Sequence, residues 1–255
     1  MIQTDARVTG CREILEGIFV LKLHSPEIAG AALPGQFVNI RCTGGCLPLL
    51  RRPFSISRIE GDSFELMFNV VGQGTRLLSE KREGDALDVL GPLGVPFRLS
   101  GTFRTALLVS GGLGVAPFPF LTSALLKEGK KVETYVGARD VRQLAEQHLQ
   151  NIHVATDDGS KGFHGTVIDL LRNEALHEQQ EKVKLFGCGP TKMLQALSEY
   201  ARRVGIECEL SLEGAMACGM GFCQGCPVER TSGKKKYSLV CIDGPTFNSN
   251  DIVIG

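Results

Sequence analysis

Residues 106–117 read Ala106-Leu107-Leu108-Val109-Ser110-Gly111-Gly112-Leu113-Gly114-Val115-Ala116-Pro117, a short apolar run followed by a glycine-rich turn. The run has the length and composition of a buried strand, and the turn indicates the start of a helix. Further apolar runs at 132–136, 152–156, 184–187 and 209–212 alternate with helical patterns near 115–128, 141–149, 166–174 and 191–204. This alternation predicts an α/β domain with a parallel, doubly wound sheet.

The glycine-rich turn also predicts a dinucleotide site. Gly112 and Gly114 allow the backbone to approach a pyrophosphate, which would lie at the positive end of the following helix. The G-x-G-x-x-P pattern departs from the G-x-G-x-x-G fingerprint because Pro117 replaces the last glycine, and no acidic residue ends the second strand. The prediction therefore rests on the position of the turn rather than on the motif.

Two other strand ends are expected at the same edge of the sheet, where ligands bind in doubly wound folds. Asp157 and Asp158 follow one strand, and Cys188 ends another. Carboxylates near the expected ribose would accept its hydroxyls and repel a 2′-phosphate, which predicts a preference for NAD over NADP. Cys188 has two interpretations, tight packing at a turn or a place beside a nicotinamide ring. The five histidines, among them His153 and His177, show no ligand spacing and are interpreted as surface or helix-end residues.

Residues 1–99 have a different pattern. Short alternating segments such as 18–23, 36–41 and 63–68 are broken by glycine and proline, which is typical of an antiparallel barrel or sandwich. One short helix is expected in this region, near 74–79. The change of periodicity after residues 100–101 predicts the clearest domain boundary.

Two stretches of this N-terminal region have the residue types of a cofactor site. In the first, Arg52 can neutralise a phosphate, Phe54 can face a planar ring system and Ser55 can hydrogen-bond the edge of that ring. The second, at 69–75, is a glycine-rich turn from strand to helix that offers backbone N–H groups to a pyrophosphate. Each stretch taken alone is also typical of an ordinary turn.

The C-terminal region carries the most specific pattern in the chain. Cys218, Cys223 and Cys226 have the spacing C-x4-C-x2-C, and Cys241 follows at a distance. This is the plant-type ferredoxin spacing, in which four thiolates hold a [2Fe–2S] cluster. The alternatives are a structural zinc site, which usually brings two C-x2-C pairs, and a disulfide.

The residues around these cysteines predict a tight loop followed by a hairpin. Glycines between the thiols allow backbone N–H groups to point at sulfur. Met220 and Phe222 have two interpretations: they shield a cluster from water, or they form an apolar docking patch rimmed by polar residues such as Gln224 and Arg230. Residues 227–230 and 236–240 would pair as a hairpin with a basic tip.

Length and composition indicate how many domains the chain can form, which partners it has and where it is located. The 255 residues, of which 43% are apolar, are enough for two domains and a small appendage. Lys+Arg and Asp+Glu each number 28, which argues against nucleic acid and anionic membrane surfaces as partners. Nine cysteines without a signal peptide or an apolar spanning run predict a reducing, cytoplasmic location. The cysteines outside the motif are interpreted mostly as small buried hydrophobes: Cys11, Cys42, Cys46, Cys188 and Cys208.

The order of these motifs resembles the ferredoxin–NADP reductase superfamily across nearly residues 1–210, with R-x-F-S in a barrel and then G-x-G-x-x-P and C-G-P in a sheet. The cysteine motif, the residues around Cys241, and stretches 51–53 and 72–75 make the whole chain similar to the electron-transfer subunits of class 1B dihydroorotate dehydrogenase. Phe54 stands where the superfamily commonly has tyrosine, so a ring face is kept and a hydroxyl is lost.

The resemblance implies a fold class and a set of sites. The fold is multi-domain: an FAD-binding antiparallel β-barrel (1–100), an NAD-binding α/β doubly wound parallel-sheet domain (101–207) and a small C-terminal [2Fe-2S] segment (208–255). The site residues that the resemblance implies are Arg52, Pro53, Phe54, Ser55, Asn69, Val70, Gly74 and Thr75 for FAD, Gly112, Gly114 and Pro117 for NAD, and Cys218, Cys223, Cys226 and Cys241 for the cluster. Asp157 and Cys188 join the expected NAD residues because of their strand-end positions.

The implied activity is hydride exchange between NAD(H) and FAD, followed by one-electron steps through the cluster. No acid–base catalytic residue is assigned, because hydride transfer needs positioning rather than proton transfer. The implied partner is an FMN-containing dihydroorotate dehydrogenase catalytic subunit, in a heterotetramer with two copies of each chain. Pyrimidine chemistry must lie in that partner, since no part of this chain is left to form a barrel of about 250 residues.

Two alternatives remain open at this point. One is a related flavin and iron–sulfur subunit, as in an NAD-dependent ferredoxin:NADP reductase or a sulfur-reducing hydrogenase. The other is a zinc-stabilised nucleotide-binding regulatory module without redox activity. An absorbance spectrum separates the second from the rest, because flavin and iron–sulfur clusters are coloured and zinc is not.

Overall fold

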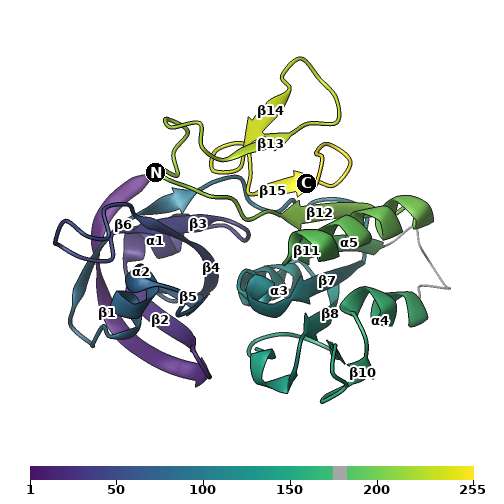
Figure 1. Cartoon of the computed structure of the whole chain (residues 1–255), viewed down its shortest axis with the longest axis horizontal. Coiled ribbons are helices and arrows are strands. Elements are labelled where there is room, and N and C mark those ends of the chain that lie inside the picture. Colours follow the sequence, from purple (N-terminus) through teal and green to yellow (C-terminus); the bar gives the residue numbers. More distant parts are fainter. Residues whose placement is uncertain (175–182) are drawn as a thin grey trace.

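The computed structural model describes residues 1–174 and 183–255, and its N-terminal part is a closed antiparallel barrel (Figure 1). The closed order of its strands confirms the barrel over the sandwich. Its core is formed by alternate strand residues such as Val38, Ile40, Phe64 and Leu66. The six strands, in the order β1-β2-β5-β4-β3-β6 around the barrel, are β1 (Ile2–Leu15), β2 (Ile18–His24), β3 (Phe37–Ile40), β4 (Arg52–Glu60), β5 (Ser63–Asn69) and β6 (Ala86–Leu93).

The barrel holds one helix that the sequence predicts and one that it does not. Helix α2 (Gln73–Ser79) follows β5 directly, as expected. Helix α1 (Pro26–Ala31) was missed, although Ser25 caps it by accepting from the Ile28 N–H and Pro26 occupies its first turn. A six-residue helix shows too little periodicity to stand out from a loop.

The second part is a seven-stranded sheet with helices on both faces, which confirms the doubly wound fold. Neighbouring residues of the central strand alternate between two apolar cores, because Ala106 and Leu108 pack under α3 while Leu107 and Val109 pack under α4 and α5. The sheet order is β10 (Phe163–His164), β9 (Ile152–Thr156), β8 (Lys131–Ala138), β7 (Thr105–Gly111), β11 (Val183–Cys188), β12 (Glu207–Ser211) and β15 (Thr246–Asn248), and the helices are α3 (Phe118–Lys127), α4 (Val167–Asn173) and α5 (Thr191–Val204).

The helix predicted at 141–149 is wrong. Only one 3₁₀ turn, η2 (Val141–Gln143), forms there, and His148 has a positive φ that ends any helical path. Leu144 and Ala145 are buried, and Ala145 packs with Met67 of the barrel. Packing between the domains therefore overrides the local helical pattern.

The C-terminal segment lies above both domains in Figure 1. It contains the predicted hairpin, formed by β13 (Pro227–Glu229) and β14 (Tyr237–Leu239), while β15 pairs antiparallel with β12 at the edge of the sheet. Because β12 begins at Glu207, that strand lies on both sides of the predicted boundary at 207/208. Phe37 of the barrel shares an apolar core with Cys226 and Cys241, so the segment packs on both domains.

A buried lysine anchors the link between barrel and sheet. Lys184 is fully buried, and its ammonium group lies 3.1 Å from Glu209 and 2.8 Å from the carbonyl of Arg98. The Arg98 N–H donates to the same Glu209 carboxylate at 2.8 Å. These bonds fix the segment that leaves the barrel against the sheet. In the described part of the chain, no helix is long and apolar enough to cross a membrane.

Candidate functional site

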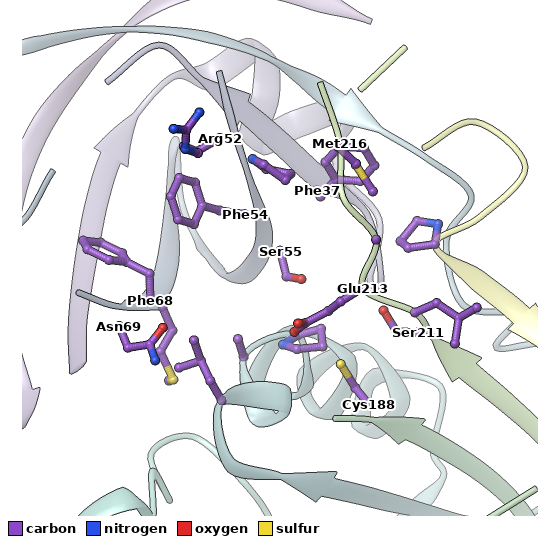
Figure 2. A pocket seen from close by; sticks show the side chains of 18 of the residues that line it. Phe37, Arg52, Phe54, Ser55, Phe68, Asn69, Cys188, Ser211, Glu213 and Met216 are labelled. Carbon is purple, nitrogen blue, oxygen red and sulfur yellow. The ribbon is translucent and has the colours of Figure 1, made fainter. Parts of the chain in front are cut away.

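A cavity of about 300 Å³ lies between the barrel and the sheet. Arg52, Phe54 and Ser55 of β4 line one side of it, and Cys188 and Glu213 lie across from them (Figure 2). The Phe54 ring packs on Phe68 with ring centroids 5.5 Å apart. A cavity with a cation at one end, an aromatic face along one wall and a hydroxyl beside it fits a flavin.

The glycine turn adds a cradle under Arg52. A Cβ at Gly74 would lie 3.3 Å from two atoms of the Arg52 side chain, so the absence of a side chain at 74 gives the arginine its place. Thr75 lines the cavity, and its Oγ1 accepts from the N–H groups of Val71 and Gly72. Pro53 and Asn69 also line the cavity. Val70, which the sequence also predicts there, does not line it, and its N–H donates to the Gly17 carbonyl.

A second cavity, of about 780 Å³, opens at the carboxyl ends of the sheet strands. Gly112, Gly114 and Asp157 line it as the sequence predicts. Gly112 has a φ of +54° and open space beside it, so its backbone is accessible to a ligand. The volume and the glycine-rich wall fit a dinucleotide. Three cations that sequence reasoning missed also line this cavity: Arg139, Arg172 and Lys192.

Pro117 and Cys188 lie in the first cavity rather than the second. A Cβ on Gly114 would overlap the Cys188 carbonyl, which shows that the turn packs directly on the end of β11. Burial raises the pKa of the Cys188 thiol to about 12, so this group stays protonated at neutral pH. Tight packing at the turn is confirmed for Cys188, which is 3% exposed and lies in the wall of the first cavity. Its place beside a nicotinamide ring stays a prediction.

Glu213 lies at the junction of the two cavities and was missed by sequence reasoning. Asn69, Leu113 and Glu213 line both cavities, so ligands in the two would meet there. The Glu213 side chain is accessible through the open cavity, and its partial burial raises the pKa of its carboxyl group. The signal was available, because Glu213 follows β12 at the same strand-end edge as Asp157 and Cys188.

The four motif cysteines come together in two pairs. Burial alone would raise the pKa of the Cys218 thiol, but N–H groups of Cys223 and Met220 that donate to its sulfur at 3.4 and 3.5 Å lower that pKa to about 7. A side-chain hydrogen bond with the free Cys223 thiol also lowers the pKa of Cys218. Burial and a neighbouring Cys226 thiol raise the pKa of Cys241 to about 12.

This arrangement fits a [2Fe–2S] cluster. Each iron of such a cluster takes two thiolates, and the chain offers the pairs Cys218–Cys223 and Cys226–Cys241 with backbone N–H groups aimed at sulfur. Among residues 1–174 and 183–255, no three His, Cys, Asp or Glu side chains lie close enough together to hold a single metal ion.

The remaining cysteines and histidines differ in part from expectation. Cys42, Cys188 and Cys208 are buried as expected, but Cys46 is exposed. His153 is not a surface residue, because it is half-buried on β9, stacks on Tyr135 at 4.5 Å and pairs with Glu133 and Glu174. His177 lies outside the described residues.

Sequence comparison identifies relatives along the whole chain. Residues 213–253 match the family model of the iron–sulfur cluster binding domain of dihydroorotate dehydrogenase B. The chain is 35% identical to the dihydroorotate dehydrogenase B (NAD(+)) electron transfer subunit of Desulforamulus reducens, with 98% of this chain and 97% of that protein covered. It is 38% identical to the subunit of the same name from a Geobacillus species, with full coverage of both.

Structure comparison gives the same picture. The structure of an NADH-dependent reduced ferredoxin-NADP oxidoreductase aligns with a TM-score of 0.85 and 30% identity, over 98% of this chain and 90% of that one. Phthalate dioxygenase reductase shares the fold at 18% identity, with a TM-score of 0.63 and 94% of each chain covered.

Proposed function

The chain belongs to the family of dihydroorotate dehydrogenase B electron transfer subunits, and we propose that it relays electrons between NAD(H), FAD, a [2Fe–2S] cluster and an FMN-containing catalytic subunit. The catalytic subunit would interconvert dihydroorotate and orotate in pyrimidine biosynthesis. We further propose a heterotetramer with two copies of each chain, with FAD on the barrel, NAD on the α/β domain and the cluster on the C-terminal segment.

One observation supports the proposal most strongly. The first cavity, where we place FAD (the flavin cavity), shares part of its wall with the support of residues 216–226, which carry Cys218, Cys223 and Cys226 (the cluster loop). Phe37 and Met216 line the cavity, and both belong to the apolar core that contains Cys226 and Cys241. Figure 2 shows these two side chains on the same side of the cavity. An electron carrier in the cavity would therefore have the cluster loop as its neighbour on one side and the second cavity on the other.

The bound groups would supply hydride chemistry at FAD and one-electron chemistry at the cluster. The residues of the chain position these groups. Arg52 offers charge to a phosphate, and Phe54 and Ser55 offer a face and a hydrogen-bonding edge to a ring. Leu113 and Pro117 add apolar side chains to the wall of the flavin cavity.

The test is reconstitution with a partner. The chain is produced with an FMN-containing dihydroorotate dehydrogenase subunit, and reduction of NAD by dihydroorotate is assayed for the complex and for each chain alone. We expect activity only in the complex, while the isolated chain oxidises NADH with artificial acceptors. Electron transfer to ferredoxin and NADP without any response to dihydroorotate would favour the function named for its structural relative instead.

Asp157 is expected to set the preference for NAD. Replacing Asp157 with asparagine removes a negative charge from the dinucleotide cavity, so the ratio of kcat/KM for NADPH to that for NADH should rise about fivefold, or ~1 kcal/mol for charges ~4 Å apart in water. Asp158→Asn is the matched control, because Asp158 does not line the cavity and its carboxylate accepts from the Ser160 N–H. An unchanged ratio in Asp157→Asn would reject the assignment.

Phe222 is expected to dock on the partner. It is 82% exposed on the cluster loop, whereas Met220 is half-buried and packs on the apolar core of the segment. Phe222→Asp should weaken binding of the catalytic subunit about fivefold or more, because a buried interface aromatic contributes above ~1 kcal/mol. Visible absorbance should stay unchanged. Leu126→Asp, at an exposed leucine of α3, is the control, and equal affinities of the two variants would count against this interface.

A further inference from the structure

Asn39 is a buried polar residue that lies between β4, which lines the flavin cavity, and the cluster loop. It lies on β3, which pairs with β4 so that Asn39 is opposite Pro53 and Phe37 is opposite Ser55. Both Pro53 and Ser55 line the flavin cavity. The neighbours of Asn39 along the strand, Val38 and Ile40, point into the barrel core, so the Asn39 side chain points outward to the C-terminal segment.

The outward side chain holds the cluster loop directly. Asn39 Nδ2 donates to the carbonyl oxygen of Cys218 at 3.1 Å. The next residue, Gly219, has a φ of +69°, and a Cβ there would overlap Asn39 Nδ2. The Asn39 amide therefore hydrogen-bonds to Cys218 and fills the space beside Gly219, where a side chain would otherwise lie. A direct contact of this kind fixes the start of the loop relative to the barrel.

The same amide has an oxygen that the fold does not use. Asn39 is only 1% exposed, and its Oδ1 has no hydrogen-bond partner among the described residues. An unpaired buried oxygen costs free energy, which an apolar residue of the same shape would avoid. The bond to Cys218 fixes the orientation of the amide, since the opposite orientation would place Oδ1 against a carbonyl oxygen. Asparagine at this position is thus explained by its donor group.

We propose that Asn39 is a positioning residue that tunes the cluster by holding the Cys218 turn. With the Cys218 carbonyl fixed, the N–H groups of Met220 and Cys223 face the Cys218 sulfur, at 3.5 and 3.4 Å. Hydrogen bonds to cluster sulfurs stabilise the added electron and raise the reduction potential. Through this contact β3, whose Phe37 lines the flavin cavity, would influence the reduction potential of the cluster. This inference rests on the proposed function.

The test compares Asn39→Leu with the native chain, both purified anaerobically with FAD and cluster. Leucine keeps the shape and removes the donor. We expect the cluster potential, measured by redox titration of its EPR signal, to fall by about 59 mV, which is a tenfold change for a one-electron couple. In the metal-free chain, hydrogen exchange at the Met220 and Cys223 amides should become faster. Thr134→Val is the control, because it removes another buried unpaired oxygen, on β8, and should leave both readouts unchanged.

The outcomes separate this inference from the proposed function. Loss of the cluster from Asn39→Leu with FAD retained would support the positioning role, whereas a native potential and native exchange rates would overturn it. If Asn39→Leu does not fold, Asn39→Val is measured instead, since β-branched residues suit a strand. A native chain that holds no iron would contradict the proposed function itself, before any variant is compared.

Discussion

Cys223→Ser is expected to lose its iron while keeping its FAD. Cys223 is an exposed thiol in a pair with Cys218, so serine there leaves one iron of the cluster with a single thiolate. The flavin cavity has none of the four motif cysteines in its wall, so flavin binding should persist. Iron analysis and the absorbance spectrum of anaerobically purified protein measure both groups at once.

Cys46→Ser is the matched control for this experiment. Cys46 is also exposed and free, but it lies in the loop between β3 and β4, outside the motif. This variant should retain the full iron content of the native chain. Zinc in place of iron in the native protein, or full iron in Cys223→Ser, would show that the motif does not hold a cluster.

Arg52→Ala is expected to weaken FAD binding by about 1.5–3 kcal/mol, which is roughly 10- to 150-fold in Kd. The loss reflects a charge-assisted hydrogen bond to a phosphate. The Arg52 side chain is already held in place in the structure. Its Nη1 donates to the carbonyls of Leu50 and Arg51 at 2.8 and 3.3 Å, and its aliphatic part lies over Gly74. Flavin retention on gel filtration and fluorescence titration of the stripped protein with FAD measure the effect.

Arg58→Ala serves as the control on the same strand. Arg58 lies on β4 but pairs with Glu60 and Glu65 at 3.4 and 3.7 Å and is not part of the cavity wall. Its removal should leave FAD affinity within experimental error, because the Arg58 side chain does not line the cavity. Equal FAD affinities of Arg52→Ala and the native chain would show that the phosphate lies elsewhere.

The parts of the fold that the sequence predicts are those with local signals. Strand β7 and its glycine turn are recognisable because a buried parallel strand is apolar throughout and a tight turn needs glycine. Residues 141–149 show the limit: their helical pattern is overridden by contacts of Leu144 and Ala145 that no local window contains. Helix α1 was missed for the opposite reason, since its Ser25-Pro26 start is a good signal on a very short element.

Some residues of the candidate site could likewise be predicted from local sequence signals, and others could not. Cysteine spacing predicted four ligand thiols because a cluster needs four of them in a fixed pattern, and the structure brings these thiols together in two pairs. Strand ends pointed to Asp157 and Cys188, but which cavity each faces depends on how the barrel docks on the sheet. Glu213 and Asn39 belong to no recognisable sequence motif. The position of Glu213 between the two cavities and the contact of Asn39 with Cys218 are visible only in the folded chain.

We expect this chain to pass electrons from NADH to its own cluster. Anaerobic titration of the purified chain with NADH, followed by visible absorbance and low-temperature EPR, measures this transfer. We predict that the flavin absorbance bleaches and that the signal of a reduced [2Fe–2S] cluster appears in the same titration. Flavin that bleaches beside a cluster that stays oxidised, or a protein with no iron signal after full reduction, would contradict the account.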